Sequence, residues 1–145
     1  LIKEIFPKAK IINCKRNSTS SIISIFKNNL GDVSWAHDLK NIFQYFDIYH
    51  KKISEFKKMF PKFIYDVQLE SFIKNPENES KKLLDFCGLE WNIKCLEYYK
   101  RNDLISRTAS NIQIRNPIYQ DSKTKNSFYK KFFQKFYKKY SWLSN

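Results

Sequence analysis

Residues 10–26, KIINCKRNSTSSIISIF, contain the order of residues that decides the predicted fold. An apolar, β-branched run ends at Cys14, two cations follow, and a cluster of small polar residues leads into a second apolar run. This order predicts a buried strand over 9–14 and then a helix running toward Leu30, with its N-cap within 17–20. A strand followed by a helix is the building unit of an α/β fold.

The rest of the chain predicts further elements of the same kinds. A second strand is expected over 62–69, directly after Pro61, which cannot continue a helix. The two glycines, Gly31 and Gly88, are expected to end helices. Four further helices follow from the spacing of their apolar residues, over 34–59, 77–87, 93–99 and 127–142.

Size and composition indicate a folded α/β chain. With 145 residues the sequence is long enough for one domain with a modest core, and 17% aromatic residues favour packing over disorder. No apolar stretch approaches the roughly 18 residues of a membrane span. Cys14, Cys87 and Cys95 show no metal-ligand spacing, so we expect small buried side chains in a reducing, cytoplasmic location.

The chain is strongly basic. Its formal net charge of +13 comes from 27 basic and 14 acidic residues, which favours anionic partners such as nucleotides, nucleic acid or acidic membranes. Lysine greatly outnumbers arginine, and an AT-rich genome explains this bias equally well. The final predicted helix has aromatic residues on one half of its surface and lysines on the other. Such a helix either covers a core or binds an acidic membrane surface.

Lys15 and Arg16 stand at the predicted carboxyl end of the first strand. Ligands of open parallel sheets bind beyond this end, and the start of the next helix points unpaired N–H groups to the same place. Ser20, Ser21 and Ser24 share a helix face at three/four spacing. Cations, a helix start and hydroxyls together make a plausible phosphate cradle. A surface loop with ordinary capping serines is the alternative that these residues alone leave open.

The run FPKAKIINCKRN at 6–17 resembles the 3′-phosphate-binding segment of sulfotransferases that use 3′-phosphoadenosine 5′-phosphosulfate (PAPS). In that family an arginine and a serine eight residues later bind the 3′-phosphate of the nucleotide. Arg16 and Ser24 have this spacing, so the resemblance assigns them that role. The family usually has a proline soon after the arginine, and here Ser18 occupies that place.

Three more stretches resemble the same family, in the same order. Residues 34–61 resemble the long helix of bacterial and tyrosylprotein-type sulfotransferases, and 69–91 resemble their following Asn/Asp-Pro and FCGLxW segment. RTASNIQIRNPIY at 107–119 resembles the late loop that closes over the nucleotide. The resemblance implies nucleotide or sulfonate contacts for Ser110, and it makes Arg115 a weaker candidate for a phosphate or acceptor contact. Lys15 is a further nucleotide-binding candidate, from its place at the strand end beside Arg16. Many relatives carry an aromatic residue near the adenine where this chain has Leu69.

The resemblance implies an α/β, partial P-loop-like sulfotransferase fold, with few parallel strands flanked by mostly α-helices. Residues 1–145 are expected to form a single domain, the C-terminal part of a sulfotransferase domain. The family's N-terminal strand, PKSGTT-type loop and helix have no match here, so we expect a truncated chain. The catalytic base, a His or Glu, is then expected upstream of Leu1, and neither His37 nor His50 is assigned that role.

The implied function is transfer of a sulfonate group from PAPS to a hydroxyl or amine acceptor. PAPS is the co-substrate and no metal is implied. The isolated chain is expected to be inactive, and neither the acceptor nor the oligomeric state follows from the sequence. Two alternatives stay open: a basic nucleic-acid-binding module, and a non-catalytic peripheral interaction domain held by the last helix.

Overall fold

The computed structural model describes residues 2–28, 30–101, 115–118 and 127–143, with only the backbone at 127, 128 and 130. Its contacts divide the chain into two compact units. Unit 1 combines residues 1–15 with 65–121, and unit 2 combines 16–64 with 122–145. Each unit therefore depends on packing between segments that are far apart in the sequence. The expectation of a single domain stays a prediction.

A two-stranded parallel sheet is formed by β1 (Ile11–Lys15) and β2 (Ile64–Gln68), and all of its residues except Ile64 belong to unit 1. A short helix, α1 (Ile2–Ile5), precedes it. Both strands were predicted, at slightly different bounds. A side-chain hydrogen bond also joins the two strands: Asn13 of β1 donates from Nδ2 to Asp66 Oδ1 of β2 at 2.8 Å. The predicted α/β class is therefore confirmed, with few parallel strands among mostly helical elements.

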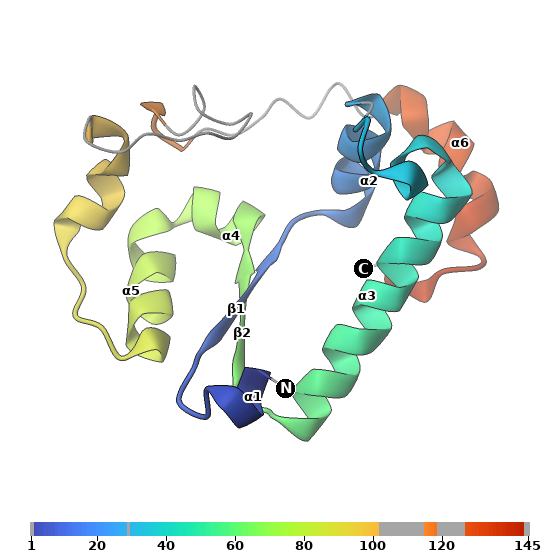
Figure 1. The fold of residues 1–145 in the computed structure, drawn as a ribbon. Helices are drawn as coiled ribbons and strands as arrows, with labels where there is room; N and C mark the ends of the chain where they lie inside the picture. The colour runs from blue at the N-terminus through green and yellow to red at the C-terminus, as the bar shows by residue number, and fades with distance from the viewer. Residues whose placement is uncertain (1, 29, 102–114, 119–126, 144–145) are drawn as a thin grey trace. The chain divides into compact units, whose positions relative to one another are not determined.

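Three helices follow the sheet in unit 1: α4 (Leu69–Lys74), α5 (Pro76–Cys87) and the 3-10 helix η2 (Ile93–Lys100). Figure 1 shows α5 beside the two strands, and the rings of Tyr65 and Phe86 stack there with their centres 5.0 Å apart. Pro76 is the first residue of α5, a position that needs no N–H donor. The α4 helix was not predicted, because the strand was expected to reach Leu69.

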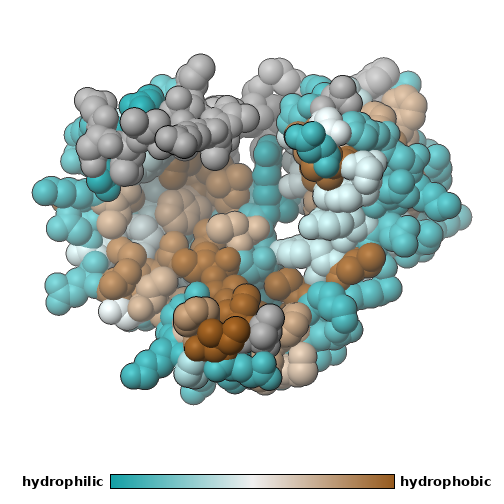
Figure 2. Space-filling model, in the orientation of Figure 1, coloured by the Kyte–Doolittle hydropathy of each residue, from teal (hydrophilic) through white to brown (hydrophobic). Residues whose placement is uncertain are grey.

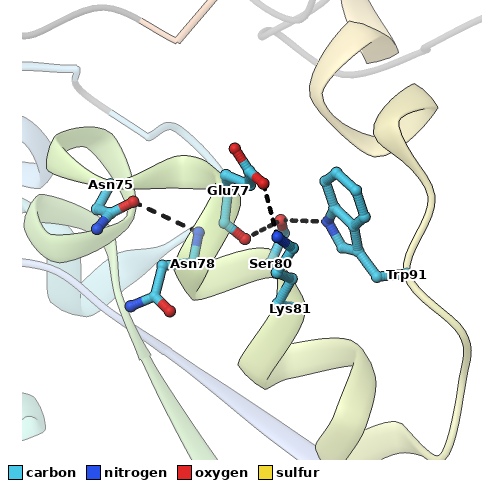
Figure 3. A network of polar contacts seen from close by, with 6 residues as sticks. All are labelled: Asn75, Glu77, Asn78, Ser80, Lys81 and Trp91. Carbon is cyan, nitrogen blue, oxygen red and sulfur yellow. Dashed lines mark hydrogen bonds and ion pairs between the residues drawn. The ribbon is translucent and has the colours of Figure 1, made fainter.

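A buried hydroxyl fixes the segment that follows α5. Ser80 donates from Oγ to the carbonyl of Glu77 at 2.9 Å, and it accepts from Trp91 Nε1 at 3.0 Å (Figure 3). Lys81 pairs with Glu77 at 2.6 Å and also lies over the Trp91 ring, 4.6 Å from its centre. The indole is therefore held against α5 by one hydrogen bond and one cation–π contact.

Gly88 ends α5 in the left-handed conformation, with φ +73°. The N–H of Leu89 donates to the carbonyl of Leu84 at 2.9 Å, as in a Schellman cap. We expect Gly88→Ala to lower the free energy of unfolding by about 1 kcal/mol, because a Cβ disfavours positive φ. No atom lies within 4 Å of the new Cβ, so the cost is one of backbone conformation.

The other glycine provides the control for this prediction. Gly31 has an ordinary φ, and no atom lies within 4 Å of the position that a Cβ would occupy there. Gly31→Ala is therefore expected to be neutral or slightly stabilising. Urea unfolding of both variants measures the difference. Equal losses in the two variants would show that the left-handed cap at Gly88 is not the cause.

Unit 2 is helical. It contains α2 (Ser18–Lys27), the 3-10 helix η1 (Ser34–His37), α3 (Leu39–Met59), α6 (Ser127–Tyr137) and the short 3-10 helix η5 (Ser141–Leu143). Figure 1 shows α2 and α6 beside α3. Their apolar faces meet in a core made of Ile22, Ile23, Ile42, Phe43, Phe133, Phe136, Tyr140 and Leu143. The amphipathic faces predicted for these helices therefore cover a core.

Three helix boundaries in unit 2 differ from the predictions. The expected helix over 34–59 is interrupted, because Asp38 is extended and caps α3, its Oδ1 accepting from the N–H of Asn41 at 3.0 Å. The expected helix over 127–142 ends at Tyr137 and is followed by η5. The helix α2 ends at Lys27, with Asn28 as its C-cap, so Gly31 does not end it.

The expectation that all three cysteines are buried is wrong. Cys14 and Cys95 are exposed and Cys87 is half-buried, and all three are free thiols. Cys14 follows the buried Asn13, and neighbouring residues of a strand face opposite sides of the sheet. Ile12, on the same face as Cys14, is also exposed.

Apolar side chains are exposed at the start of the chain as well. Ile2 and Ile5 of α1 and the following Phe6 are more than half exposed, and Figure 2 shows brown surface over α1. Across the described residues, none of the helices combines the length and the apolar character needed to cross a membrane.

Candidate functional site

The junction between β1 and α2 carries the predicted anion-binding residues. Asn17 is the N-cap of α2: its Oδ1 accepts from the N–H of Ser20 at 2.9 Å, and its carbonyl accepts from the N–H of Ser21 at 3.0 Å. The first N–H groups of a helix have no partner inside it, and the helix dipole adds partial positive charge there. The predicted cap within 17–20 is confirmed, and the helix start has the electrostatics that suit an anion.

Arg16 lies between β1 and this cap, and its side chain is exposed. Within the ranges that the structure describes, no carboxylate pairs with its guanidinium. A guanidinium presents five N–H donors in a planar fork that matches the oxygens of a phosphate. The donors of Arg16 are therefore available to a ligand from outside the chain, as the predicted anchor requires.

Lys15, the neighbouring cation, has a different environment. Its Nζ lies 3.5 Å from Asp66 Oδ2, while the other oxygen of that carboxylate accepts from Asn13. Asp66 therefore joins two side chains of β1 to β2. A contact between Lys15 and a phosphate stays a prediction. It requires the ammonium group of Lys15 to move away from Asp66.

Ser24 lies on α2, in the same unit as Arg16, and is half-buried. Its Oγ accepts from Asn28 Nδ2 at 3.3 Å, one helical turn further on. The hydroxyl keeps its own proton for donation to an anion, because this contact uses only an oxygen lone pair. At a rise of about 1.5 Å per residue, Ser24 stands about 9 Å along the helix from Ser18. A shared phosphate therefore requires the long Arg16 side chain to fold back along α2.

The remaining predicted residues lie apart from this junction in the sequence. Ser110 is outside the described residues. Arg115 belongs to unit 1 and is exposed. Leu69 begins α4 and is 39% exposed. It offers an apolar surface, but no aromatic ring, at the position where the resemblance places an aromatic residue near the adenine.

His50 is a neighbour of α2 that sequence reasoning missed. Its Nε2 lies 3.4 Å from Ser18 Oγ, in the first turn of α2, although the two residues are 32 positions apart. No local pattern in the sequence predicts such a contact, because the contact depends on how α2 packs against α3. His37, the other histidine, is exposed in η1.

These observations define a class of protein. A parallel pair of strands among mostly helical elements makes this an α/β chain, with an exposed arginine directly before a capped helix start. Similarity to known proteins identifies the family within this class.

Residues 1–92 match the model of a sulfotransferase family, described as "Sulfotransferase family". The match covers more than half of the chain, and the chain belongs to this family. It includes β1, α2, α3, β2 and α5, and with them Arg16 and Ser24. Ser110, Arg115 and α6 lie beyond the matched residues.

One relative matches over a longer part of the chain. It is a protein of Aquifex aeolicus (strain VF5) that bears the name "Uncharacterized protein". The two are 34% identical over 136 residues, which cover 91% of this chain and 18% of the relative. The chain thus spans about a fifth of the relative's length, and the matched part extends well past residue 92.

Proposed function

We propose that this chain supplies the 3′-phosphate-binding part of a PAPS-dependent sulfotransferase. The observation that carries the proposal is Arg16: an exposed guanidinium with no carboxylate partner among the described residues, between β1 and the capped start of α2. It lies inside the segment that matches the family, and Ser24 follows at the spacing that the family uses.

In the proposed reaction the acceptor is a hydroxyl or an amine. Its oxygen or nitrogen attacks sulfur, the bond from sulfur to the bridging phosphate oxygen breaks, and the acceptor proton passes to a base. Arg16 and Ser24 take no part in these bond changes. They hold the 3′-phosphate, which fixes the register of the nucleotide and so contributes by positioning. Arg16 also offsets charge on the departing bisphosphate through its guanidinium.

Three further contacts belong to the same proposal. Ser110 would orient the sulfonate or the nucleotide, and Lys15 and Arg115 would add positive charge near the phosphates. The acceptor and the catalytic base stay unassigned. We also place the chain in the cytoplasm, since three free thiols are compatible with a reducing compartment.

Nucleotide binding tests the proposal directly. Isothermal calorimetry compares adenosine 3′,5′-bisphosphate, the reaction product, with adenosine 5′-monophosphate, which lacks the 3′-phosphate. We expect the bisphosphate to bind at least about tenfold more tightly, the scale of a charged hydrogen-bond contact. Equal affinities for the two nucleotides would contradict the proposed 3′-phosphate site. A random-sequence DNA duplex that binds with steep salt dependence, together with equal nucleotide affinities, would favour a nucleic-acid-binding module.

A further inference from the structure

A line of side-chain contacts in unit 2 joins the end of the chain to the first turn of α2. His50 of α3 lies 3.4 Å from Ser18 Oγ, and its ring stacks on Trp142 with the ring centres 4.8 Å apart and the planes 24° from parallel. Trp142 in turn donates from Nε1 to Asp47 Oδ1 at 3.2 Å. The imidazole is therefore between a hydroxyl of α2 and an indole of η5.

The indole is itself held firmly. Its neighbours in the chain, Tyr140 and Leu143, are buried in the core of unit 2. Lys51 pairs with Asp47 at 2.8 Å, and this hydrogen bond is the largest cause of a lowered pKa of Asp47. The hydrogen bond from Trp142 lowers the pKa further, while burial raises it in part. Asp47 is thus a carboxylate that stays charged and keeps the indole N–H in place.

From this geometry we infer that His50 and Trp142 are positioning residues for the nucleotide site. They brace the first turn of α2 through Ser18, and Arg16 precedes that turn by two residues. The inference rests on the proposed function. It extends the site to η5, which lies beyond the residues matched by the family and contributes no ligand group of its own.

The charged groups around His50 predict how the brace responds to pH. Among the described residues, Asp47, Lys51 and the phenol of Tyr49 flank it on α3. Tyr140 and Trp142 approach from the segment after α6, and α2 contributes the uncharged Ser18. Lys51 is already paired with Asp47. A protonated imidazole is attracted by the Asp47 carboxylate and by the indole face, so protonation strengthens the contact with Trp142.

Protonation of His50 is therefore expected to increase nucleotide affinity. The contact with Ser18 persists in both states, because a hydroxyl can donate to a neutral ring nitrogen and accept from a protonated one. A positive charge beside α2 also favours an anionic ligand. By linkage, bound nucleotide raises the pKa of His50.

The test is calorimetry of adenosine 3′,5′-bisphosphate between about pH 5.5 and pH 8, across the usual range of histidine titration. The variants are His50→Gln, which keeps a hydrogen-bonding side chain without a charge change, and His50→Ala, which removes the contact with Ser18. His37→Gln is the control for the loss of a histidine. The ligand's own protonation is common to all proteins and cancels in the comparison.

We expect wild type and His37→Gln to gain about five- to tenfold in affinity over His50→Gln at the acid end. His50→Ala should bind the bisphosphate about fivefold more weakly than His50→Gln at the alkaline end, with a smaller preference for the 3′-phosphate because Arg16 is less well positioned. Trp142→Ala should reduce the pH response in the same way. Nuclear magnetic resonance titration of the His50 imidazole, with and without bound nucleotide, checks the linkage.

The outcomes separate this inference from the proposed function. If wild type prefers the bisphosphate but His50→Gln keeps the full pH response, His50 is not a positioning residue and the 3′-phosphate site stands. A role in folding alone would lower the unfolding midpoint of His50→Gln and leave its pH profile unchanged. If wild type shows no preference for the 3′-phosphate, both ideas fail together.

Discussion

Arg16→Ala is expected to weaken binding of adenosine 3′,5′-bisphosphate by about 10- to 150-fold, which corresponds to about 1.5–3 kcal/mol. The side chain is exposed and has no carboxylate partner within the described ranges, so its removal costs the fold little. Its loss removes a two-donor contact with the phosphate. Affinity for adenosine 5′-monophosphate should change far less, since that ligand has no 3′-phosphate.

Arg101→Ala is the matched control. Arg101 is also exposed, and its removal lowers the net charge of the chain by the same amount. We expect its nucleotide affinity to stay within about twofold of wild type, because the proposal gives Arg101 no contact with the nucleotide and salt screens the general effect of one exposed charge. Arg16→Lys should fall between wild type and Arg16→Ala, since an ammonium group lacks the planar fork. Equal losses in Arg16→Ala and Arg101→Ala would mean that overall charge, and not an anchor, holds the nucleotide.

Phe43→Ala is expected to lower the free energy of unfolding of unit 2 by about 3–5 kcal/mol. Phe43 is fully buried and is the centre of the aromatic core. Its ring stacks on Phe136 with the centres 4.0 Å apart and meets Phe133 edge-on at 5.1 Å. Truncation removes both contacts and leaves a cavity between α3 and α6, where the surrounding helices can relax only partly.

Phe56→Ala is the control for that loss, since Phe56 lies on the same helix but is 47% exposed. Its cost should stay below about 1 kcal/mol, as is usual for a surface substitution. Urea titration followed by circular dichroism measures both variants. A similar, small effect in the two would mean that α3 and α6 do not share the core described here.

The sequence was sufficient for most elements, because apolar spacing and capping residues act locally. The apolar, β-branched run of the first strand, the cap at Asn17 and the stop at Gly88 depend on neighbours within a few residues. The interruption at Asp38 could have been read as a cap, since an aspartate three residues before Asn41 has the geometry to accept its N–H. Instead, one continuous helix was expected from residue 34, although the apolar spacing that predicted it begins only at Leu39.

The candidate site divides in the same way. Arg16 and Ser24 were named from the resemblance of one continuous stretch of sequence to a segment of the family, and as ligands they stay a prediction. The partner of Lys15 does not follow from such a stretch, because Asp66 is reached only when β2 pairs with β1. The contact between His50 and Ser18 depends likewise on the packing of α2 against α3. Long-range partners of this kind need the tertiary structure, and a single sequence does not contain them in any local pattern.

The three tryptophans of the chain are divided between the two units, and this has an experimental consequence. Trp91, held by Ser80, is the one indole of unit 1, while Trp35 and Trp142 belong to unit 2. Intrinsic fluorescence therefore offers a separate optical signal for each unit. With Trp35 and Trp142 replaced by phenylalanine, the emission of Trp91 alone would follow the unfolding of unit 1. Comparing this melting curve with the melting curve of unit 2 would show whether the chain unfolds in one cooperative step or in two.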